Sequence, residues 1–122
     1  MMRFLFLVLL CHYSLALLAQ QDSLDFYLKG AEQAHKQGNT QVALTGYLRV
    51  AFVQENVKDE KNLPNTYETI AKLYQNKQIY QKSLDYCLKS YKIRQNQNNK
   101  IQLLHTLQQL GMSYYLVNNF IT

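Results

Sequence analysis

The stretch Tyr67–Ile93 has the clearest pattern of apolar and polar residues in the chain. Its apolar residues fall at positions i, i+3, i+4 and i+7 in two sets, which are Tyr67, Ile70, Ala71 and Tyr74 and then Leu84, Cys87, Leu88 and Tyr91. Each set forms one stripe along a helix, and the polar residues Asn76–Gln78 between them mark a turn. We therefore predict an antiparallel helical hairpin, whose stripes need neighbouring elements in order to be buried.

Helical patterns also precede and follow this hairpin. Gly38 is placed to end a helix, and Pro64 suits the first turn of the next one. The predicted segments are, in order, a helix from a cap at Asp22 or Ser23 to about Gln37, a helix starting at Asn39 or Thr40, a polar linker at Glu55–Asn62, the hairpin, a polar linker at Gln95–Lys100 and a helix over about Ile101–Val117. Gly30 and Gly46 fall inside helices, where each costs about 1 kcal/mol relative to Ala, so we expect close helix approach at both.

The predicted helices resemble one another at a shift of 40 residues. The corresponding residues of the first, third and fifth helices are Tyr27, Tyr67 and Leu107, then Ala31, Ala71 and Gly111, then Ala34, Tyr74 and Tyr114. Those of the second and fourth helices are Leu44 and Leu84, Tyr47 and Cys87, Leu48 and Leu88, and Ala51 and Tyr91. Self-similarity at a fixed period of this size is typical of a helical repeat array.

These motifs resemble the tetratricopeptide repeat (TPR) family. The run from Leu107 to Tyr114 reads Leu-x-x-Leu-Gly-x-x-Tyr, with Phe120 six residues on, and is similar to the first half of such a repeat. The run from Tyr67 to Cys87 resembles a complete repeat, and the run from Ala31 to Tyr47 a degenerate one. The common repeat has about 34 residues, so a period of 40 implies longer helices or linkers. The resemblance implies an all-α fold, with antiparallel helix-turn-helix repeats stacked as a short α-solenoid at about residues 24–60, 64–100 and 101–122, the third repeat being truncated.

In arrays of this family the first helix of each hairpin lines a concave groove that takes a protein or peptide partner. The groove positions that the resemblance implies are Asn65, Glu68, Lys72, Gln75 and Asn76 in the second repeat, and His105, Gln108, Met112, Tyr115 and Leu116 in the third. Their mixture of amides, one acid and one base suits hydrogen bonding to a peptide backbone. The alternative is that they are only solvent-facing residues of a structural array.

The N-terminus has the residue order of a secretory signal peptide. Arg3 comes first, the apolar run Phe4–Leu10 follows, and small residues lie near two candidate cleavage points, after Ala16 or after Ala19. We favour Ala19, which makes residues 1–19 the signal peptide and predicts a periplasmic or extracellular protein. Because His12–Ser14 interrupt the apolar stretch, it is short for a membrane span, and a signal anchor is the alternative.

Charge and cysteine content limit the classes of function that we expect for this sequence. Cleavage removes Arg3 and Cys11, which leaves 12 basic and 8 acidic residues and Cys87 as the one thiol. A lone cysteine on an apolar helix face is typical of a packed core residue. Three lysines, Lys82, Lys89 and Lys92, share the polar face of one helix, as a solvated face does, so we expect no nucleic-acid partner.

Residues that could carry catalysis do not converge in this sequence. The glycines are scattered singly, so they form no phosphate-binding loop. His35 and His105 have no second histidine or cysteine at metal-ligand spacing. We therefore expect no enzymatic activity, no cofactor and no metal within these residues.

The function that these observations favour is a non-catalytic, extracytoplasmic protein-interaction module. An exported array of this kind resembles the N-terminal region of bacterial envelope proteins such as TPR-containing sensor histidine kinases, in which a membrane helix follows the repeats. The alternatives are a free-standing secreted or periplasmic adaptor, and the leading part of an envelope enzyme. The wide apolar arc of the last helix predicts an uncovered face and self-association.

Overall fold

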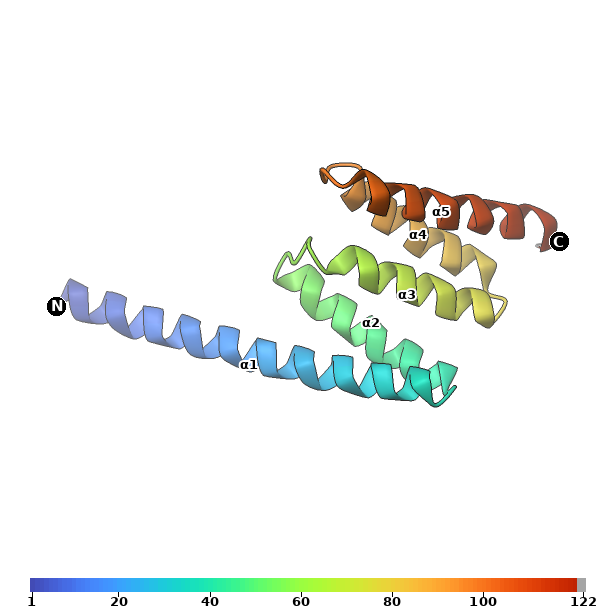
Figure 1. Ribbon diagram of the computed structural model, residues 1–122. Helices are drawn as coiled ribbons and strands as arrows, with labels where there is room; N and C mark the ends of the chain where they lie inside the picture. The colour runs from blue at the N-terminus through green and yellow to red at the C-terminus, as the bar shows by residue number, and fades with distance from the viewer. Residues whose placement is uncertain (121–122) are drawn as a thin grey trace.

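The computed structural model describes residues 1–120, and these residues form helices with no strand (Figure 1). The helices are α1 (Met2–Lys36), α2 (Thr40–Asn56), α3 (Leu63–Asn76), α4 (Tyr80–Arg94) and α5 (Lys100–Phe120). The prediction of an all-α chain is therefore confirmed. Ile121 and Thr122, the last two residues of the predicted third repeat, lie outside the described residues.

Each helix packs on its neighbour in chain order, and α3 also contacts α5. Successive helices run back and forth, so that α1, α3 and α5 share one direction (Figure 1). The N-terminal part of α1 extends beyond the other helices and makes no contact with them in this view (Figure 1). The C-terminal part of α1 and the other four helices carry the residues of the polar and apolar sites described below.

Local signals end the helices where the sequence predicts. Gly38 has φ +74°, a left-handed conformation that glycine adopts without strain. The Asn39 side chain caps α2 by accepting a hydrogen bond from the Val42 backbone N–H at 3.3 Å. Pro64 lies in the first turn of α3, and the turn between α3 and α4 follows Asn76, as predicted.

The predicted helix start at Asp22 or Ser23 is wrong. The Ser23 hydroxyl donates to the Ala19 carbonyl at 2.9 Å, one turn back, instead of capping a new helix. Residues 2–29 contain no glycine or proline, so nothing interrupts the helix before Gly30. The resulting α1 is long and apolar enough to cross a membrane, and an apolar helix at the N-terminus fits either a signal sequence or a membrane span.

The core consists of two clusters of buried apolar side chains. The larger one joins α1, α2 and α3, and its members are Ala31, Ala34, Ala43, Leu44, Tyr47, Ala51, Leu63, Tyr67, Ile70, Leu73 and Tyr74. The smaller one joins α3, α4 and α5 through Ala71, Leu84, Cys87 and Leu110. Ala71 and Cys87 are thus packed as predicted. Leu88 was expected on the buried stripe but is exposed, because the buried face of α4 is turned toward Ser83, Ser90 and Arg94.

Gly30 of α1 and Gly46 of α2 differ in how closely a neighbouring helix approaches them. A Cβ at Gly46 would lie 2.7 Å from the Ala31 Cβ, so α1 and α2 approach closely there, as predicted. A Cβ at Gly30 would have no atom within 4 Å, and the expectation of close approach at Gly30 is wrong. The reason is geometric, since Gly30 lies one residue, or about 100° around the helix, from Ala31.

Helix α5 buries a different stripe from the one that α3 buries against α4. Leu110, Thr106 and Ser113 are buried, whereas Leu107 is 43% exposed and Tyr114 is 45% exposed. Within the wide apolar arc of the last helix, Leu107 and Tyr114 therefore belong to the exposed face. The corresponding residues of α3, Tyr67 and Tyr74, are covered by α4; within residues 1–120, no helix covers this side of α5.

Candidate functional site

The most connected polar residue of the molecule is Glu68, which lies on α3 and faces α4 and α5. It was predicted as a solvent-facing groove residue, and the structure corrects this, because its exposed fraction is only 6%. The sequence pattern gave no warning, since Glu68 precedes the apolar Ile70 and Ala71 on a helix whose other charged residue, Lys72, is exposed. Its burial depends on α5, whose nearest residues are more than thirty positions further along the chain.

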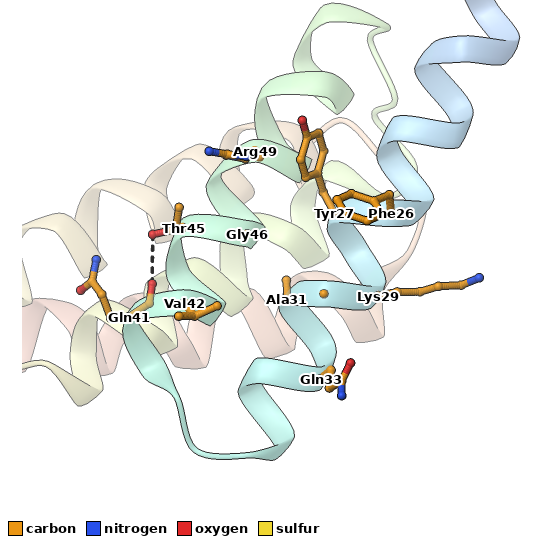
Figure 2. Close-up of a pocket in the computed structure, with 11 residues that line it drawn as sticks. Phe26, Tyr27, Lys29, Ala31, Gln33, Gln41, Val42, Thr45, Gly46 and Arg49 are labelled. Carbon is orange, nitrogen blue, oxygen red and sulfur yellow. Dashed lines mark hydrogen bonds between the residues drawn. The ribbon is translucent and has the colours of Figure 1, made fainter.

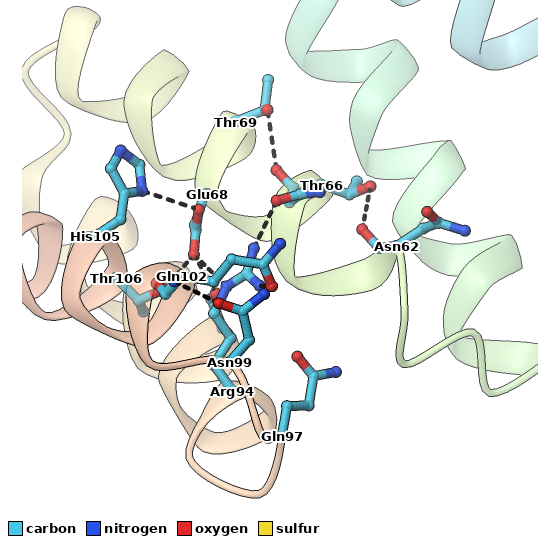
Figure 3. Close-up of polar contacts among 12 residues, drawn as sticks. Asn62, Thr66, Glu68, Thr69, Arg94, Gln97, Asn99, Gln102, His105 and Thr106 are labelled. Atoms are coloured by element: carbon cyan, nitrogen blue, oxygen red, sulfur yellow. Dashed lines mark hydrogen bonds and ion pairs between the residues drawn. The ribbon is translucent and has the colours of Figure 1, made fainter.

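Three side chains donate hydrogen bonds to one oxygen of Glu68, Oε1 (Figure 3). The Ser90 hydroxyl donates at 2.7 Å and the Arg94 Nε–H at 2.9 Å, both from α4. The Thr106 hydroxyl, from α5, is 2.6 Å away. The carboxylate therefore joins three helices, and we call Glu68, Ser90, Arg94 and Thr106 the Glu68 network.

The Arg94 guanidinium uses its other two nitrogens to hold both flanking helices (Figure 3). One donates to the Gln102 Oε1 on α5 at 2.6 Å, and the other to the Asn65 Oδ1 on α3 at 2.5 Å. All three nitrogens thus have acceptors, as a buried guanidinium needs. Because Arg94 is the last residue of α4, these contacts tie the end of α4 to both α3 and α5.

The charge state of Glu68 follows from two opposing effects. Burial by itself would raise the pKa of the carboxyl group, but the hydrogen bonds from Thr106, Ser90 and Arg94, with the charge of Arg94, outweigh it. The pKa of Glu68 is therefore below its usual value, and the ion pair is charged at neutral pH. A buried pair of this kind adds little net stability, because taking both charges out of water offsets much of their attraction.

The other predicted groove residues divide into two groups. Asn65 and His105 adjoin the Glu68 network, with the His105 Nδ1 lying 3.6 Å from the Glu68 Oε2 on an imidazole that is 56% exposed. The remainder lie apart from it, and of these Lys72, Asn76, Gln108, Met112 and Tyr115 are exposed, whereas Gln75 and Leu116 are half-buried. The structure therefore brings together three of the predicted residues, namely Asn65, Glu68 and His105.

A polar hollow between α1 and α3 was not predicted from the sequence. Its volume is about 370 Å³, and it is lined by Gln21, Leu24, Asp25, Leu28, Glu32, Tyr47, Gln54, Asn62, Asn65, Thr66 and Thr69. Gln54 of α2 is only 4% exposed, and its Oε1 has no hydrogen-bond partner. The hollow could have been predicted from the 40-residue shift, because this shift places the shorter Gln54 at the position that Arg94 has in the next hairpin.

An apolar hollow of about 540 Å³ lies between α1 and α2 (Figure 2). Phe26, Tyr27, Val42 and Gly46 are among its lining residues. The residue that corresponds to Gly46 in the second hairpin is Tyr86, whose ring lies 5.8 Å from that of Tyr67 and 5.7 Å from that of Tyr74. Gly46 thus lines the hollow where α1 and α2 meet closely, and the second hairpin has an aromatic ring at this position.

The thiol of Cys87 is buried. Burial raises the pKa of the Cys87 thiol, whose Sγ lies 3.2 Å from the Ser113 Oγ, so it is protonated at neutral pH. Residues 1–120 contain no group of three or more His, Cys, Asp or Glu side chains placed to hold a metal ion. The site's chemistry is hydrogen bonding and charge pairing.

Comparison with known proteins gives no relative for this chain. No protein-family model matches it, and neither the curated proteins nor the solved structures contain a match.

Proposed function

We propose that this chain is a non-catalytic protein-interaction module built from TPR-like helical hairpins, and that a second copy is its first partner. The observation that carries the proposal is the uncovered side of α5. The exposed large side chains of this helix include Leu104, Leu107, Met112, Tyr114 and Tyr115. An apolar set of this extent on one helix is typical of an interaction surface.

The packing of α4 on α3 indicates the kind of element that covers such a surface. On α3, the residues Tyr67, Ala71 and Tyr74 lie against α4. Their counterparts on α5 are Leu107, Gly111 and Tyr114, and a Cβ at Gly111 would have no atom within 4 Å. An amphipathic helix therefore fits this surface, and Gly111 permits its close approach.

A second copy of α5 supplies such a helix without electrostatic conflict. The helix contains no Asp or Glu, and its one Lys or Arg is Lys100 at its first residue. Two α5 helices that pack antiparallel about Gly111 place Leu107 of one copy opposite Tyr114 and Tyr115 of the other. The contact is then self-complementary, as a two-fold dimer requires.

The location that we propose is outside the cytoplasm, with α1 acting during export. Cleavage after Ala19 would leave the part of α1 that packs on α2, since Ala31 and Ala34 are its buried residues. A retained α1 would instead anchor the module to the membrane. We propose that the module serves as the sensory or scaffolding part of an envelope protein such as a TPR-containing sensor histidine kinase, the alternatives being a free-standing adaptor and the leading part of an envelope enzyme.

Sedimentation equilibrium of the exported protein tests the proposed surface. We expect a dimer in the wild type and a monomer in the double variant Leu107→Lys with Tyr114→Lys. The control is Val42→Lys, which replaces an exposed apolar residue at the position where the second hairpin has Lys82. A wild-type monomer at all concentrations would overturn the proposal, and a dimer that persists in the double variant would move the interface away from α5.

A further inference from the structure

The hollow between α1 and α3 occupies the place that the Arg94 guanidinium fills between α3 and α5. A shift of 40 residues relates the two sites member by member. The pairs are Gln54 and Arg94, Asp25 and Asn65, Asn62 and Gln102, Thr66 and Thr106, and Leu28 and Glu68. The two sites thus have similar polar surroundings, but Leu28 stands where Glu68 pairs with Arg94, and only one of the sites holds a guanidinium.

The hollow exists because Gln54 is shorter than Arg94 and reaches neither flanking helix. Its Oε1 lacks a hydrogen-bond partner although the side chain is buried, which is unfavourable for a polar atom. The Oε1 is itself buried, so it meets a ligand in the hollow only when the amide, whose two ends have nearly the same shape, turns its oxygen outward. A ligand that carries N–H donors would then satisfy it.

The lining residues also favour a positive ligand. Asp25 and Glu32 are acidic, and none of the residues that line the hollow is Lys, Arg or His. In the filled site, the positions that correspond to these two acids hold Asn65 and Lys72. The filled site thus contains its own cation, whereas the hollow carries unbalanced negative charge.

Acceptors for a planar donor group stand on two sides of the hollow. The Asn62 amide nitrogen donates to the Asp59 Oδ2 at 2.9 Å, which leaves the Asn62 Oδ1 as an acceptor. Asp25 of α1 and Gln54 of α2 also line the hollow. A guanidinium presents several donors in one plane and matches a carboxylate together with amide oxygens better than an ammonium does.

We propose that this hollow binds the side chain of an arginine that a partner peptide presents, in the manner in which the α3–α5 site holds Arg94. The inference rests on the proposed function, since it names the chemistry of a partner. It concerns a different surface from α5. The proposals for the hollow and for the α5 surface can therefore be tested separately.

The test is a titration of the isotope-labelled exported protein, followed by NMR, with three blocked single residues as probes. N-acetyl-arginine amide should shift the signals of the Gln54 side-chain amide and of the backbone at Asp25 and Asn62. The citrulline analogue has the same shape but no charge and should bind at least about tenfold more weakly, the loss expected for one charge-assisted interaction. The lysine analogue should fall between the two.

Three variants separate the site from general charge effects. Asp25→Asn should weaken arginine binding by about fivefold or more, whereas Asp85→Asn, which removes the same charge from the exposed face of α4, should not. Gln54→Arg should abolish binding, because its own guanidinium would fill the hollow. Circular dichroism checks that this variant is folded.

Three results would overturn the assignment. They are equal affinity for arginine and citrulline, shifts that avoid the hollow, and equal weakening by the variants at positions 25 and 85. Sedimentation of the same samples reports the α5 contact independently. Loss of the dimer with intact arginine binding would reject the α5 surface alone, and the reverse result would reject the hollow alone.

Discussion

The Lys89 Nζ lies 5.5 Å from the centre of the Tyr67 ring, in a cation–π contact between α4 and α3. The same contact occurs in the first hairpin, where the Arg49 guanidinium lies 5.4 Å from the ring of Tyr27. In both pairs the cation follows the tyrosine by 22 residues. The two hairpins therefore share a packing detail as well as a hydrophobic pattern, and this supports our proposal of a repeat architecture.

Removing one partner of the Glu68–Arg94 ion pair should destabilise the protein much more than replacing both partners. Arg94→Gln leaves the Glu68 carboxylate buried without its cation, and we expect a loss of about 3–5 kcal/mol in the free energy of unfolding. The double variant Glu68→Leu with Arg94→Gln installs the pair that the first hairpin has at Leu28 and Gln54, and it should recover most of this loss. Urea unfolding of the three proteins measures the difference, and an equally unstable double variant would contradict the prediction.

The stability of the fold should fall in acid partly because of Glu68. Its pKa is lowered on folding, so the stability that it contributes is present above the pKa of the unfolded chain, about 4.3 for a glutamate. That contribution is lost as the pH falls through the lower folded-state pKa. Urea midpoints between pH 7 and pH 3 should therefore drop less in the double variant Glu68→Leu with Arg94→Gln than in the wild type. Parallel curves would show that the network does not titrate in this way.

Two glycine-to-alanine substitutions should have opposite effects. Gly30→Ala adds a Cβ into open space within α1 and should stabilise the protein by about 0.5–1 kcal/mol. Gly46→Ala places a Cβ against Ala31 and should destabilise it by about 1–3 kcal/mol, despite the better helix propensity of alanine. Thermal unfolding of both variants decides this, and effects of the same sign would mean that α1 and α2 do not meet at Gly46.

A larger residue at position 71 should strain the second hairpin. Ala71 is buried between α3 and α4, and Ala71→Leu should cost about 1–3 kcal/mol through overpacking. Lys82→Leu, on the exposed side of α4, is the control and should change the unfolding free energy little. If both variants shift the urea midpoint equally and slightly, the proposed register of the repeats is wrong.

Thiol counting should report whether α1 is cleaved. Cys11 is exposed on the apolar part of α1, whereas Cys87 is buried and its pKa is raised by burial. The mature protein, which should begin between Leu17 and Gln21, should therefore show no fast-reacting thiol when native and one when unfolded. Intact-mass measurement of the exported product gives the cleavage point directly. A product that retains Met1 and Arg3 and shows a fast-reacting thiol would contradict cleavage.

Apart from the start of α1, the sequence by itself determined the helices and their approximate ends, because these depend on residues close together in the chain. The left-handed Gly38, the Asn39 cap and Pro64 in the first turn of α3 act within a few residues of their own positions. The burial of Ala71 was also predictable, since the helical period places it at the centre of the apolar stripe.

The tertiary structure alone decided which polar residues are buried and which glycine is a contact. Glu68 packs against α5 as well as against its hairpin partner α4, and Gln54 lies in a hollow that α3 also lines; no local pattern reports either arrangement. Gly30 and Gly46 have similar local sequence settings, and only the crossing of α1 over α2 separates them. The physical reason is that burial depends on side chains that arrive from more than twenty residues away, whereas helix propensity and capping act within one or two turns.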